Sequence, residues 1–501
     1  MTAALVSGLD AANSPENHRA LYARARAASQ RWGQQSLRNR AARLRRLLGE
    51  LDRRADELAE LIADENGKPN VEAIAHEVLP SVSHVRWLCE HGPRILAPSP
   101  RALPWMPVRT AHVHRRAHGV VLVISPWNLP LAIPFSQVTA ALLGGNAVVL
   151  KPSEVTPRVG AAIAELLAVC DLPADLFTLV QGDGGTGAAL IDARPDKVFF
   201  TGSVPTGRRV MAAASAHPIP VSLELGGVDA LLVLEDADLE LASSAAAWGA
   251  TCNTGQVCAS VERVLVHRSV ADEFRQRLED KLDRIGPSDL GRATLDRQAD
   301  VWRAHLADAQ KRDLAVHGGS WLRAGTLSPT LVSGEGTRES AVWNEESFGP
   351  LVALLPFDDD DEAVALHDST PYGLTASVFS ADVPRATALA GRLRCGLVSV
   401  NDVGATLYGH AELPWGGVGD SGFGRSHGEE GLLETTWTQV VERGRIAEIK
   451  KPWWYPYGPE QRRMFRQYVR AVATDHLPTR ARALARLSGH AARLFSEAPR
   501  W

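Results

Sequence analysis

Two residues near the middle of the chain have types and settings suited to covalent and acid–base chemistry. Cys258 follows the glycine-containing turn Asn253-Thr-Gly-Gln-Val, and a cysteine there can lie at a helix N-terminus, where its thiolate is stabilised. Glu224 stands in Leu223-Glu-Leu-Gly-Gly227, so burial should raise the pKa of its carboxyl towards neutrality, as a general base requires. Each residue also has an ordinary interpretation, a buried structural cysteine and a strand-end acid.

A third candidate is Asn128, in the turn Pro126-Trp-Asn-Leu-Pro130 that ends an apolar run. The two prolines stiffen this turn, and a rigid amide N–H at the end of a strand could stabilise a developing oxyanion. Asn128 could equally cap the helix that follows. The remaining cysteines lie within helical or strand patterns and are interpreted as structural: Cys89, Cys170, Cys252 and Cys395.

Two further turns carry residue types that bind nucleotides. In Leu150-Lys-Pro-Ser-Glu154, Lys151 could reach a phosphate or ribose and Glu154 could accept from ribose hydroxyls, although the two could instead form a solvated pair. Glu154 would repel a 2′-phosphate, which favours NAD over NADP. In Phe-Thr-Gly-Ser203, Gly202 permits close backbone approach and the next helix offers N–H groups to a phosphate; an ordinary tight turn is the alternative.

These turns follow apolar runs that predict a parallel, doubly covered sheet, whose ligands bind beyond the carboxyl ends of the strands. The strands are expected at 120–124, 147–150, 177–180, 197–200 and 221–224. The helices between them are expected at 130–143, 157–169, 186–192 and 204–215, with Thr156 as the N-cap of the second.

Flanking segments complete the expected organisation. Residues 16–65 have helical spacing that ends at Asn66-Gly-Lys-Pro69, and a second helical stretch covers 71–91. A second α/β segment runs from about 230 to 430. Its expected helices are 238–253 and 269–284, and its expected strands are 351–356, 376–379 and 397–400.

Composition excludes several classes of protein. The chain has 501 residues, 45% hydrophobic and 22% charged, with a net charge of −4 that gives no basic field for nucleic acid. Five cysteines without a C-x-x-C spacing exclude a disulfide scaffold and a zinc ribbon, and no metal is expected. No signal segment or long apolar stretch occurs, so a cytoplasmic protein is predicted.

The segment 450–501 differs in composition, with eleven Lys or Arg against three acids, a local charge of +8. An apolar helical face is expected there, formed by Leu484, Leu487, Ala491, Leu494 and Phe495. Packing on its own or a partner subunit is favoured over peripheral contact with an anionic membrane, because arginine is abundant throughout the chain.

The order of the motifs is more specific than any one of them. They are Pro-Trp-Asn (126–128), Lys-Pro-Ser-Glu (151–154), Phe-Thr-Gly-Ser (200–203), Glu-Leu-Gly-Gly (224–227), Gly-Gln-Val-Cys (255–258), Glu-Glu-Ser-Phe-Gly-Pro (345–350), Tyr-Gly-Leu (372–374) and Pro-Trp-Gly-Gly-Val-Gly-Asp-Ser-Gly-Phe-Gly-Arg (414–425). In this order the chain resembles the aldehyde dehydrogenase superfamily over about 17–445. Its tail is similar to that of some bacterial succinate-semialdehyde-dehydrogenase-like members.

The resemblance implies an α/β fold with a Rossmann-like, parallel-sheet cofactor domain, an α/β catalytic domain and a small β oligomerisation arm. The implied boundaries are 1–98 with 118–226 for the NAD-binding domain, 227–433 for the catalytic domain, 99–117 with 434–449 for the arm, and 450–501 for the basic tail. A homodimer or homotetramer is implied.

The resemblance also implies residue roles. Cys258 matches the nucleophile, Glu224 the general base, and Asn128, with the Cys258 backbone N–H, the oxyanion hole. The implied cofactor positions are Ser125, Trp127, Lys151, Glu154, Gly184, Gly187, Gly202, Ser203, Gly207, Glu346 and Phe348. The expected substrate tunnel is lined by Leu129, Ser136, Val257, Ala259 and Trp415, the last in place of a common Phe.

The expected reaction is oxidation of an aldehyde to its acid through a cysteine thiohemiacetal and thioester, with NAD, or alternatively NADP, as hydride acceptor. A medium aliphatic or aromatic aldehyde is favoured. The alternatives are a semialdehyde, which would need an arginine at the tunnel, transfer of the acyl group to coenzyme A, and a non-catalytic, membrane-associated or assembly protein.

Overall fold

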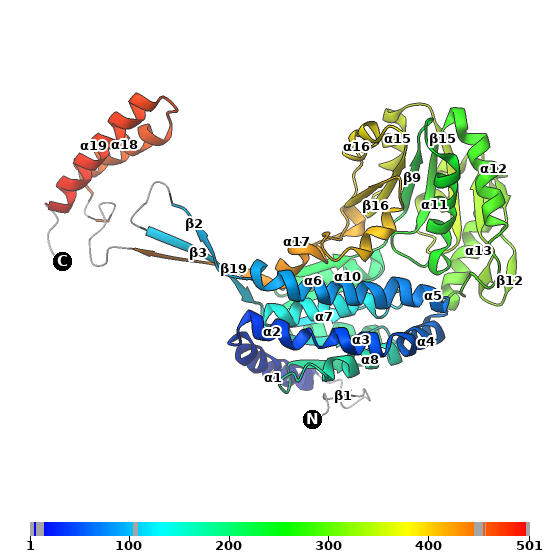
Figure 1. Cartoon of the computed structure of the whole chain (residues 1–501), viewed down its shortest axis with the longest axis horizontal. Helices are drawn as coiled ribbons and strands as arrows, with labels where there is room; N and C mark the ends of the chain where they lie inside the picture. Colours follow the sequence, from blue (N-terminus) through cyan, green and yellow to red (C-terminus); the bar gives the residue numbers. More distant parts are fainter. Residues whose placement is uncertain (1–4, 7–14, 104–108, 445–453, 456, 497–501) are drawn as a thin grey trace. The chain divides into compact units, whose positions relative to one another are not determined.

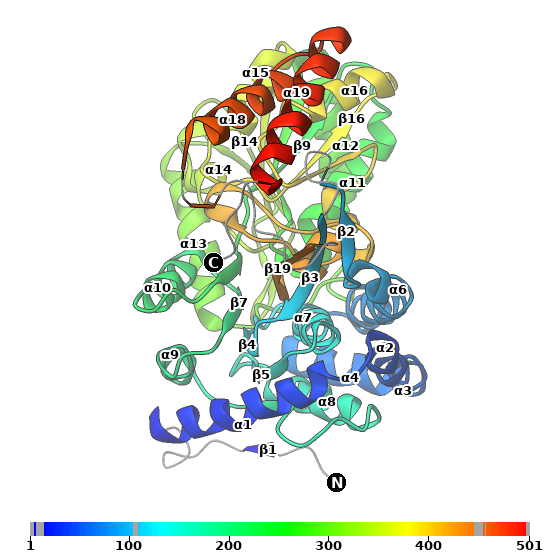
Figure 2. The same cartoon turned by 90° about the vertical axis from the view of Figure 1, so that its left-hand side faces the viewer.

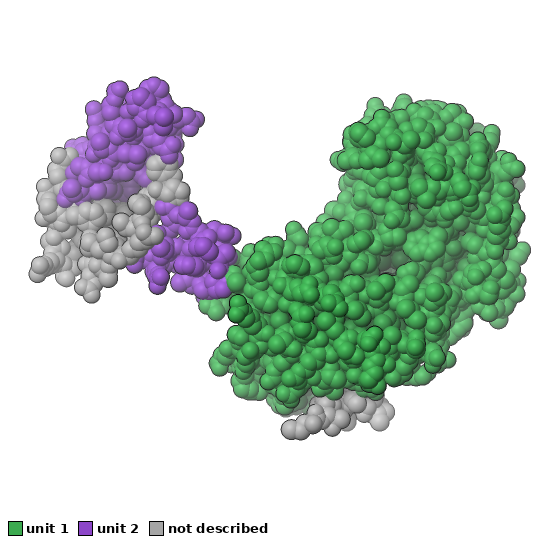
Figure 3. Space-filling model, viewed as in Figure 1, with its two compact units in different colours: residues 1–97, 115–438 green, residues 98–114, 439–501 purple. Residues whose placement is uncertain are grey.

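The computed structural model describes residues 5–6, 15–103, 109–444, 454–455 and 457–496. It divides into two compact units, residues 1–97 with 115–438 and residues 98–114 with 439–501, which Figure 3 shows in green and purple. The first unit carries two seven-stranded sheets and every predicted site residue.

The first unit begins with a layer of short helices (Figure 1). They are α1 (Pro15–Gly33), α2 (Leu37–Leu44), α3 (Leu47–Arg53), α4 (Ala55–Asn66), α5 (Asn70–Ala73), the π-helical turn η1 (Ile74–Val78) and α6 (Leu79–Ile95). The helical structure predicted over 16–65 is confirmed, but it is divided among four helices, α1 to α4, and Ser36 starts α2 by accepting from the Asn39 N–H. The predicted end at Asn66 is confirmed, where Gly67 takes a left-handed φ of 92°.

The first sheet has the strand order β1-β6-β5-β4-β7-β8-β18. Its strands are β1 (Leu5–Val6), β4 (Val120–Ile124), β5 (Ala147–Lys151), β6 (Phe177–Val180), β7 (Lys197–Thr201), β8 (Val221–Glu224) and β18 (Gly422–Phe423). Its helices are α7 (Ala132–Gly144), α8 (Pro157–Ala168), α9 (Gly184–Asp192) and α10 (Val204–Ser215). The described neighbours in it are parallel, except that β18 pairs antiparallel with β8. Burial of both faces explains the unbroken apolar strands and confirms the predicted parallel sheet.

The second sheet has the order β11-β14-β15-β10-β9-β16-β17, with β11 antiparallel at one edge. Its strands are β9 (Asp229–Val233), β10 (Val261–His267), β11 (Ala315–His317), β14 (Thr330–Ser333), β15 (Leu351–Phe357), β16 (Thr375–Phe379) and β17 (Leu397–Val400). Its larger helices are α11 (Leu239–Thr251), α12 (Ala271–Leu282), α13 (Asp296–Lys311), α15 (Asp360–His367) and α16 (Val383–Ala390). Sequence analysis did not predict β9, β10 or α13.

Two helices of the first sheet are capped by carboxylates from other helices. Thr156 occupies the predicted N-cap position of α8 and Pro157 is its first residue, but the Thr156 side chain makes no capping bond; Glu65 instead accepts from the Arg158 and Val159 N–H groups at 2.9 Å each. Glu77 likewise accepts from the first backbone N–H groups of α7. A buried acid that satisfies a helix N-terminus ties the helical layer to the sheet.

The second unit holds a small sheet and a helical hairpin. Its sheet has the order β19-β3-β2, from β2 (Ser99–Arg101), β3 (Arg109–Ala117) and β19 (Thr436–Gly444), and the last two strands continue into the first unit. Helices α18 (Pro459–Val472) and α19 (Leu477–Ser496) lie side by side and bury Met464 and Ala483 (Figures 1 and 2). Leu494 and Phe495 of the predicted apolar face lie outside the residues whose side chains are described. Among the described helices, each is too short or too polar to cross a membrane.

Candidate active site

The predicted turns converge at the carboxyl edge of the first sheet. Register pairs Ile124 of β4 with Lys151 of β5 on one side and with Phe200 of β7 on the other, and pairs Thr201 with Glu224 of β8. The residues just beyond these positions therefore lie along one edge, as the parallel sheet requires.

Beyond this edge, Cys258 and Glu224 line one cavity of about 290 Å³. Leu129, Ser136, Val257 and Trp415 of the predicted tunnel also line it. Ala259 is absent from the wall: it is 1% exposed and packs in a small hydrophobic cluster with Leu374 and Trp415, so its assignment to the tunnel is wrong. The other lining residues are Ala75, His76, Pro80, Ile133, Gln137, Thr201, Leu225, Trp248, Cys252, Asn253, Ala405, Thr406, Tyr408, Gly409 and Ser426.

Glu224 is 6% exposed, and only one of its carboxyl oxygens has a partner among the described residues. Ser426 Oγ donates to Oε1 at 3.2 Å, whereas Oε2 accepts nothing. Burial raises the pKa of Glu224 to about 8, the hydrogen bond from Ser426 opposing this shift. The predicted rise is confirmed, and the carboxylate has a vacant oxygen with which to take a proton near neutral pH.

The Cys258 thiol differs from the prediction. No helix begins at Cys258, which lies in a turn between the short η2 (Cys252–Gly255) and β10, so the predicted helix N-terminus is wrong. Burial raises the pKa of the Cys258 thiol above its usual range. The carboxylates of Asp229, Glu224 and Glu346 raise it further. The thiol is therefore protonated at neutral pH, and attack on a carbonyl requires a neighbouring base to remove its proton.

The backbone before Cys258 is held in an uncommon conformation. Asn253 and Thr254 have φ values of 49° and 57°, and Gly255 has 72°. A Cβ at Gly255 would overlap the backbone of Gly349, so this position requires glycine. Left-handed non-glycine residues persist where surrounding contacts enforce them.

Asn128 supplies part of that support. Its Nδ2 donates to the Gln256 carbonyl at 3.2 Å, and its own carbonyl accepts from Asn253 Nδ2 at 3.1 Å and from Lys68 Nζ at 2.8 Å. Because Glu77 caps α7, the helix-cap interpretation of Asn128 is wrong. Asn128 instead connects the first sheet to the loop that presents Cys258, and it does not itself line the cavity.

The cofactor residues predicted on β4 and β5 lie together. Lys151 is 3% exposed and its Nζ lies 3.3 Å from the Glu154 carboxylate, which is itself largely exposed, so the two do not form a fully solvated pair. Ser125 is also buried, and its Oγ has no partner among the described residues. An orphaned hydroxyl beside a buried lysine and an exposed carboxylate fits a ligand that carries phosphate and ribose groups.

The predicted glycines have different surroundings. Space is open around Gly184, at the start of α9, whereas a Cβ at Gly187 would lie 3.8 Å from Lys151 Cδ. Ser203 is exposed and its side chain makes no capping bond to α10, which leaves that helix N-terminus suited to a phosphate. Side chains at Gly202 and Gly207 would overlap Phe200 and Leu225, respectively, so both glycines also serve close packing.

Glu346 and Phe348 lie on a turn that faces the first sheet. Glu346 accepts from the Gly227 N–H at 3.1 Å, and burial raises its pKa to about 7. The Phe348 ring packs edge-on against Trp127, with centroids 5.5 Å apart. Sequence analysis missed the buried Glu262, which accepts from the Ser347 and Phe348 N–H groups at 2.7 and 2.8 Å and so fixes this turn.

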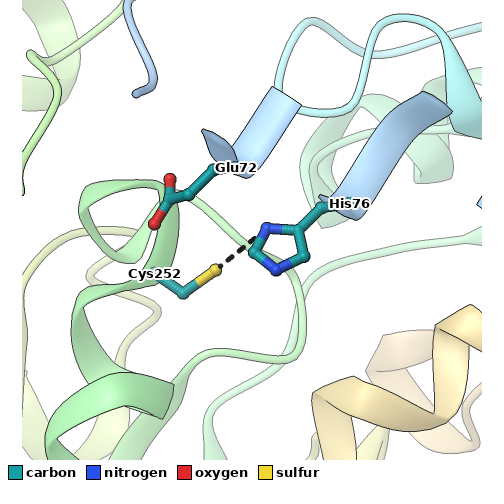
Figure 4. A group of neighbouring side chains, drawn as sticks. All are labelled: Glu72, His76 and Cys252. Atoms are coloured by element: carbon teal, nitrogen blue, oxygen red, sulfur yellow. Dashed lines mark hydrogen bonds between the residues drawn. The ribbon is translucent and has the colours of Figure 1, made fainter. Parts of the chain in front are cut away.

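A second missed feature is a cluster of Glu72, His76 and Cys252 (Figure 4). Cys252 was interpreted as structural, yet it lines the same cavity as Cys258, and its Sγ lies 3.4 Å from His76 Nδ1. Glu72 accepts from the Asn253 N–H at 2.9 Å. The cluster could not be read from sequence spacing, because the helical layer and the cysteine loop meet only in the folded chain.

Comparisons with known proteins agree with this geometry. A family model described as "Aldehyde dehydrogenase family" matches residues 5–441. A 4,4′-diapolycopene aldehyde oxidase from Methylomonas sp is 43% identical over 458 residues, which cover 89% of this chain and 85% of the relative. A Mycolicibacterium smegmatis protein named "Putative succinate-semialdehyde dehydrogenase", of the NADP(+) type, is 34% identical over 450 residues, 87% of this chain and 86% of that protein.

Solved structures give the same result. The crystal structure of an NAD-dependent aldehyde dehydrogenase from Sinorhizobium meliloti matches with a TM-score of 0.83 at 31% identity, covering 88% of this chain and 89% of that one. Betaine aldehyde dehydrogenase from Staphylococcus aureus, solved with NAD+, matches with a TM-score of 0.82 at 27% identity, covering 88% and 91%.

Proposed function

Because the chain belongs to the aldehyde dehydrogenase family and is an NAD(P)-dependent enzyme that oxidises aldehydes to acids, we propose that its substrates are apolar aldehydes. The observation that carries this proposal is the lining of the cavity shared by Cys258 and Glu224. Of the described residues in this lining, none is Arg or Lys, and aromatic or aliphatic side chains such as Trp248, Tyr408 and Ile133 form much of the wall. An apolar wall of this kind stabilises an aliphatic or aromatic aldehyde by burial.

A semialdehyde is the alternative, favoured by the names of the 34% identical relatives. The free carboxylate of a semialdehyde loses its hydration in such a cavity and needs a cationic partner to offset that loss. The lining supplies no side-chain cation, which favours the apolar class.

Cys258 carries the covalent step in the proposed mechanism. Glu224 accepts the thiol proton through its vacant Oε2, and the sulfur bonds to the aldehyde carbon. The carbonyl oxygen becomes an oxyanion, stabilised by the Asn128 amide and the Cys258 N–H after the Asn128 side chain exchanges its bond to Gln256. Bound NAD+ would supply the acceptor for the hydride that leaves this carbon. Glu224 releases the thiol proton to solvent and then removes a proton from water, whose oxygen attacks the thioester and expels the acid and the Cys258 thiolate; return of that proton to the thiolate restores the starting enzyme.

We assign the cofactor to the carboxyl edge of the first sheet. Lys151, Ser125 and the N-terminus of α10 would hold its phosphates and ribose, and Glu346 with Phe348 would hold the nicotinamide end. The exposed Glu154 carboxylate would repel a 2′-phosphate, so NAD+ is favoured over NADP+. A lower KM for NADP+ than for NAD+ would contradict this assignment.

We further propose that the second unit mediates homo-oligomerisation. Strand β19 stands at the edge of its sheet and exposes Val440 and Val441 at 61% and 43%. An exposed apolar edge strand is a surface that another chain covers. Light scattering should give a dimer or tetramer for the full chain and a smaller species for Val440→Glu.

The proposed function is tested by comparing kcat/KM for a panel of aldehydes with NAD+. Medium aliphatic and aromatic aldehydes should exceed succinate semialdehyde, and product formation should proceed without coenzyme A. A strong preference for short charged semialdehydes would contradict the apolar assignment, and an absolute need for coenzyme A would contradict hydrolysis.

A further inference from the structure

We propose that Glu72, His76 and Cys252 form a three-ligand Zn²⁺ site in the wall of the aldehyde cavity. The proposal goes beyond aldehyde oxidation, which uses none of the three side chains. Imidazole nitrogen, thiolate sulfur and carboxylate oxygen are the donor types that zinc takes in proteins, and three protein ligands with one open position are typical of reactive zinc sites.

The separation of the thiol and the imidazole fits tetrahedral coordination. The three donor atoms all lie within 4.8 Å of one another (Figure 4), and Cys252 Sγ is 3.4 Å from His76 Nδ1. Tetrahedral zinc with bonds of about 2.3 Å to sulfur and 2.0 Å to nitrogen places those two ligands about 3.5 Å apart. The thiol and imidazole therefore already have the separation that the ion requires.

The scaffold holds the ligands in place. Glu72 and His76 are four residues apart, on α5 and the π-helical turn η1, so both face the same side of this segment. Cys252 follows the last residue of α11, and Trp248 of that helix packs edge-on against the His76 ring, with centroids 5.8 Å apart. The Asn253 N–H fixes the Glu72 carboxylate, as outer hydrogen bonds do for metal ligands.

The charges around the cluster permit a cation. The nearby Lys68 ammonium is compensated by Glu77, 2.7 Å away in a fully buried ion pair. Zinc displaces the Cys252 thiol proton to solvent when it binds, as metal binding to cysteine requires.

The open coordination position has a functional consequence. His76 and Cys252 line the cavity that Cys258 and Glu224 also line. An ion bound to them occupies part of the space that the aldehyde enters, so zinc should raise the apparent KM and leave kcat at saturating aldehyde unchanged. Zinc on the nucleophile itself would instead abolish kcat.

The test is zinc binding by the full-length protein, which needs no turnover. Protein stripped with a chelator is dialysed against micromolar ZnCl₂, and bound metal is measured by mass spectrometry. Wild-type protein should retain one zinc per chain; Cys252→Ser and His76→Gln should lose it; and Cys258→Ser, which keeps the cluster, should retain it. Cobalt(II) should give a thiolate-to-metal absorption band in Cys258→Ser but not in Cys252→Ser.

Two outcomes would overturn the proposal. Wild-type protein could hold no zinc above the stripped background, or zinc could be lost from Cys258→Ser while Cys252→Ser keeps it, which would make the nucleophile the ligand. Circular dichroism of each variant establishes that it is folded. If Cys252→Ser does not fold, the zinc content of His76→Gln tests the proposal instead.

Discussion

Cys252 and Cys258 belong to one short loop, line one cavity and both have thiols whose pKa is raised by burial. Their neighbours differ. Glu224, with one vacant buried oxygen, lines the cavity with Cys258, whereas Cys252 lies against the neutral ring of His76. The difference teaches that a raised thiol pKa does not identify a structural cysteine. We infer that the role of each thiol depends on how its proton is removed: a buried carboxylate accepts the proton of Cys258, whereas at Cys252 an incoming metal ion would displace the proton to solvent.

The largest expected effect on activity comes from substituting each of the two cysteines in turn. Cys258→Ala should bind NAD+ but form no NADH with any aldehyde, because no other group supplies the covalent bond. Cys252→Ala is the matched control and should turn over, since its thiol takes no part in the proposed chemistry. Absorbance of NADH and cofactor binding by fluorescence measure the two properties. Full turnover by Cys258→Ala would refute the assignment.

Replacing the base tests why Cys258 reacts despite its raised pKa. Glu224→Gln should lower steady-state kcat by about 10²- to 10⁴-fold, because general-base assistance is lost. In the wild-type enzyme only the deprotonated carboxylate is active, so kcat/KM should rise with pH up to the Glu224 pKa of about 8 and level off above it. If kcat/KM of Glu224→Gln still rises with pH up to about 8, another group is the base.

Loss of the oxyanion contact should lower kcat less than loss of the base does. Asn128→Ala should lower kcat by about 10²- to 10³-fold, the range for loss of one oxyanion-hole donor. Because Asn128 also supports the cysteine loop, zinc binding provides the comparison: a change confined to kcat indicates transition-state stabilisation, and a parallel loss of zinc at Cys252 indicates a displaced loop.

The smallest expected effect concerns the wall that the two thiols share. Thr406 lines the cavity and is half-buried, so Thr406→Arg would place a cation there. A charge-assisted hydrogen bond of about 1.5–3 kcal/mol predicts a gain of about 10- to 100-fold in kcat/KM for succinate semialdehyde. Thr406→Gln, long but uncharged, should give little gain. Equal gains in both variants would show that charge does not set the preference.

Sequence analysis predicted the shared sheet edge of the motifs at β4, β5, β7 and β8, because each of these four follows an apolar run and parallel strands bring such turns together. Glu224 was predicted with the correct direction of its pKa shift, since the flanking leucines and glycines already indicate burial. The environment of Cys258 was not predictable, because the carboxylates of Asp229 and Glu346 reach it only through tertiary packing. The order of the motifs resembled a family but contained no information on these contacts.

Two features that sequence analysis missed have the same physical cause. A capping box or a metal motif is recognisable when its members are close in sequence, whereas Glu65 caps α8 and Glu72 supports the cysteine loop from helices far along the chain. Thr156 stands at the N-cap position of α8, but its Oγ1 has no partner among the described residues, and the distant Glu65 carboxylate accepts from the helix N–H groups instead. Long-range carboxylate contacts of this kind cannot be predicted from the spacing of residues in the sequence.

Strand β18 completes the sheet beside the proposed base, where Gly422 pairs with Glu224. During synthesis on a ribosome, β8 therefore emerges well before the segment that covers its edge. Until that segment arrives, the nascent polypeptide presents an unpaired strand to other chains, a state prone to aggregation. Shortened forms that stop before residue 422 should accumulate as inclusion bodies or associate with chaperones.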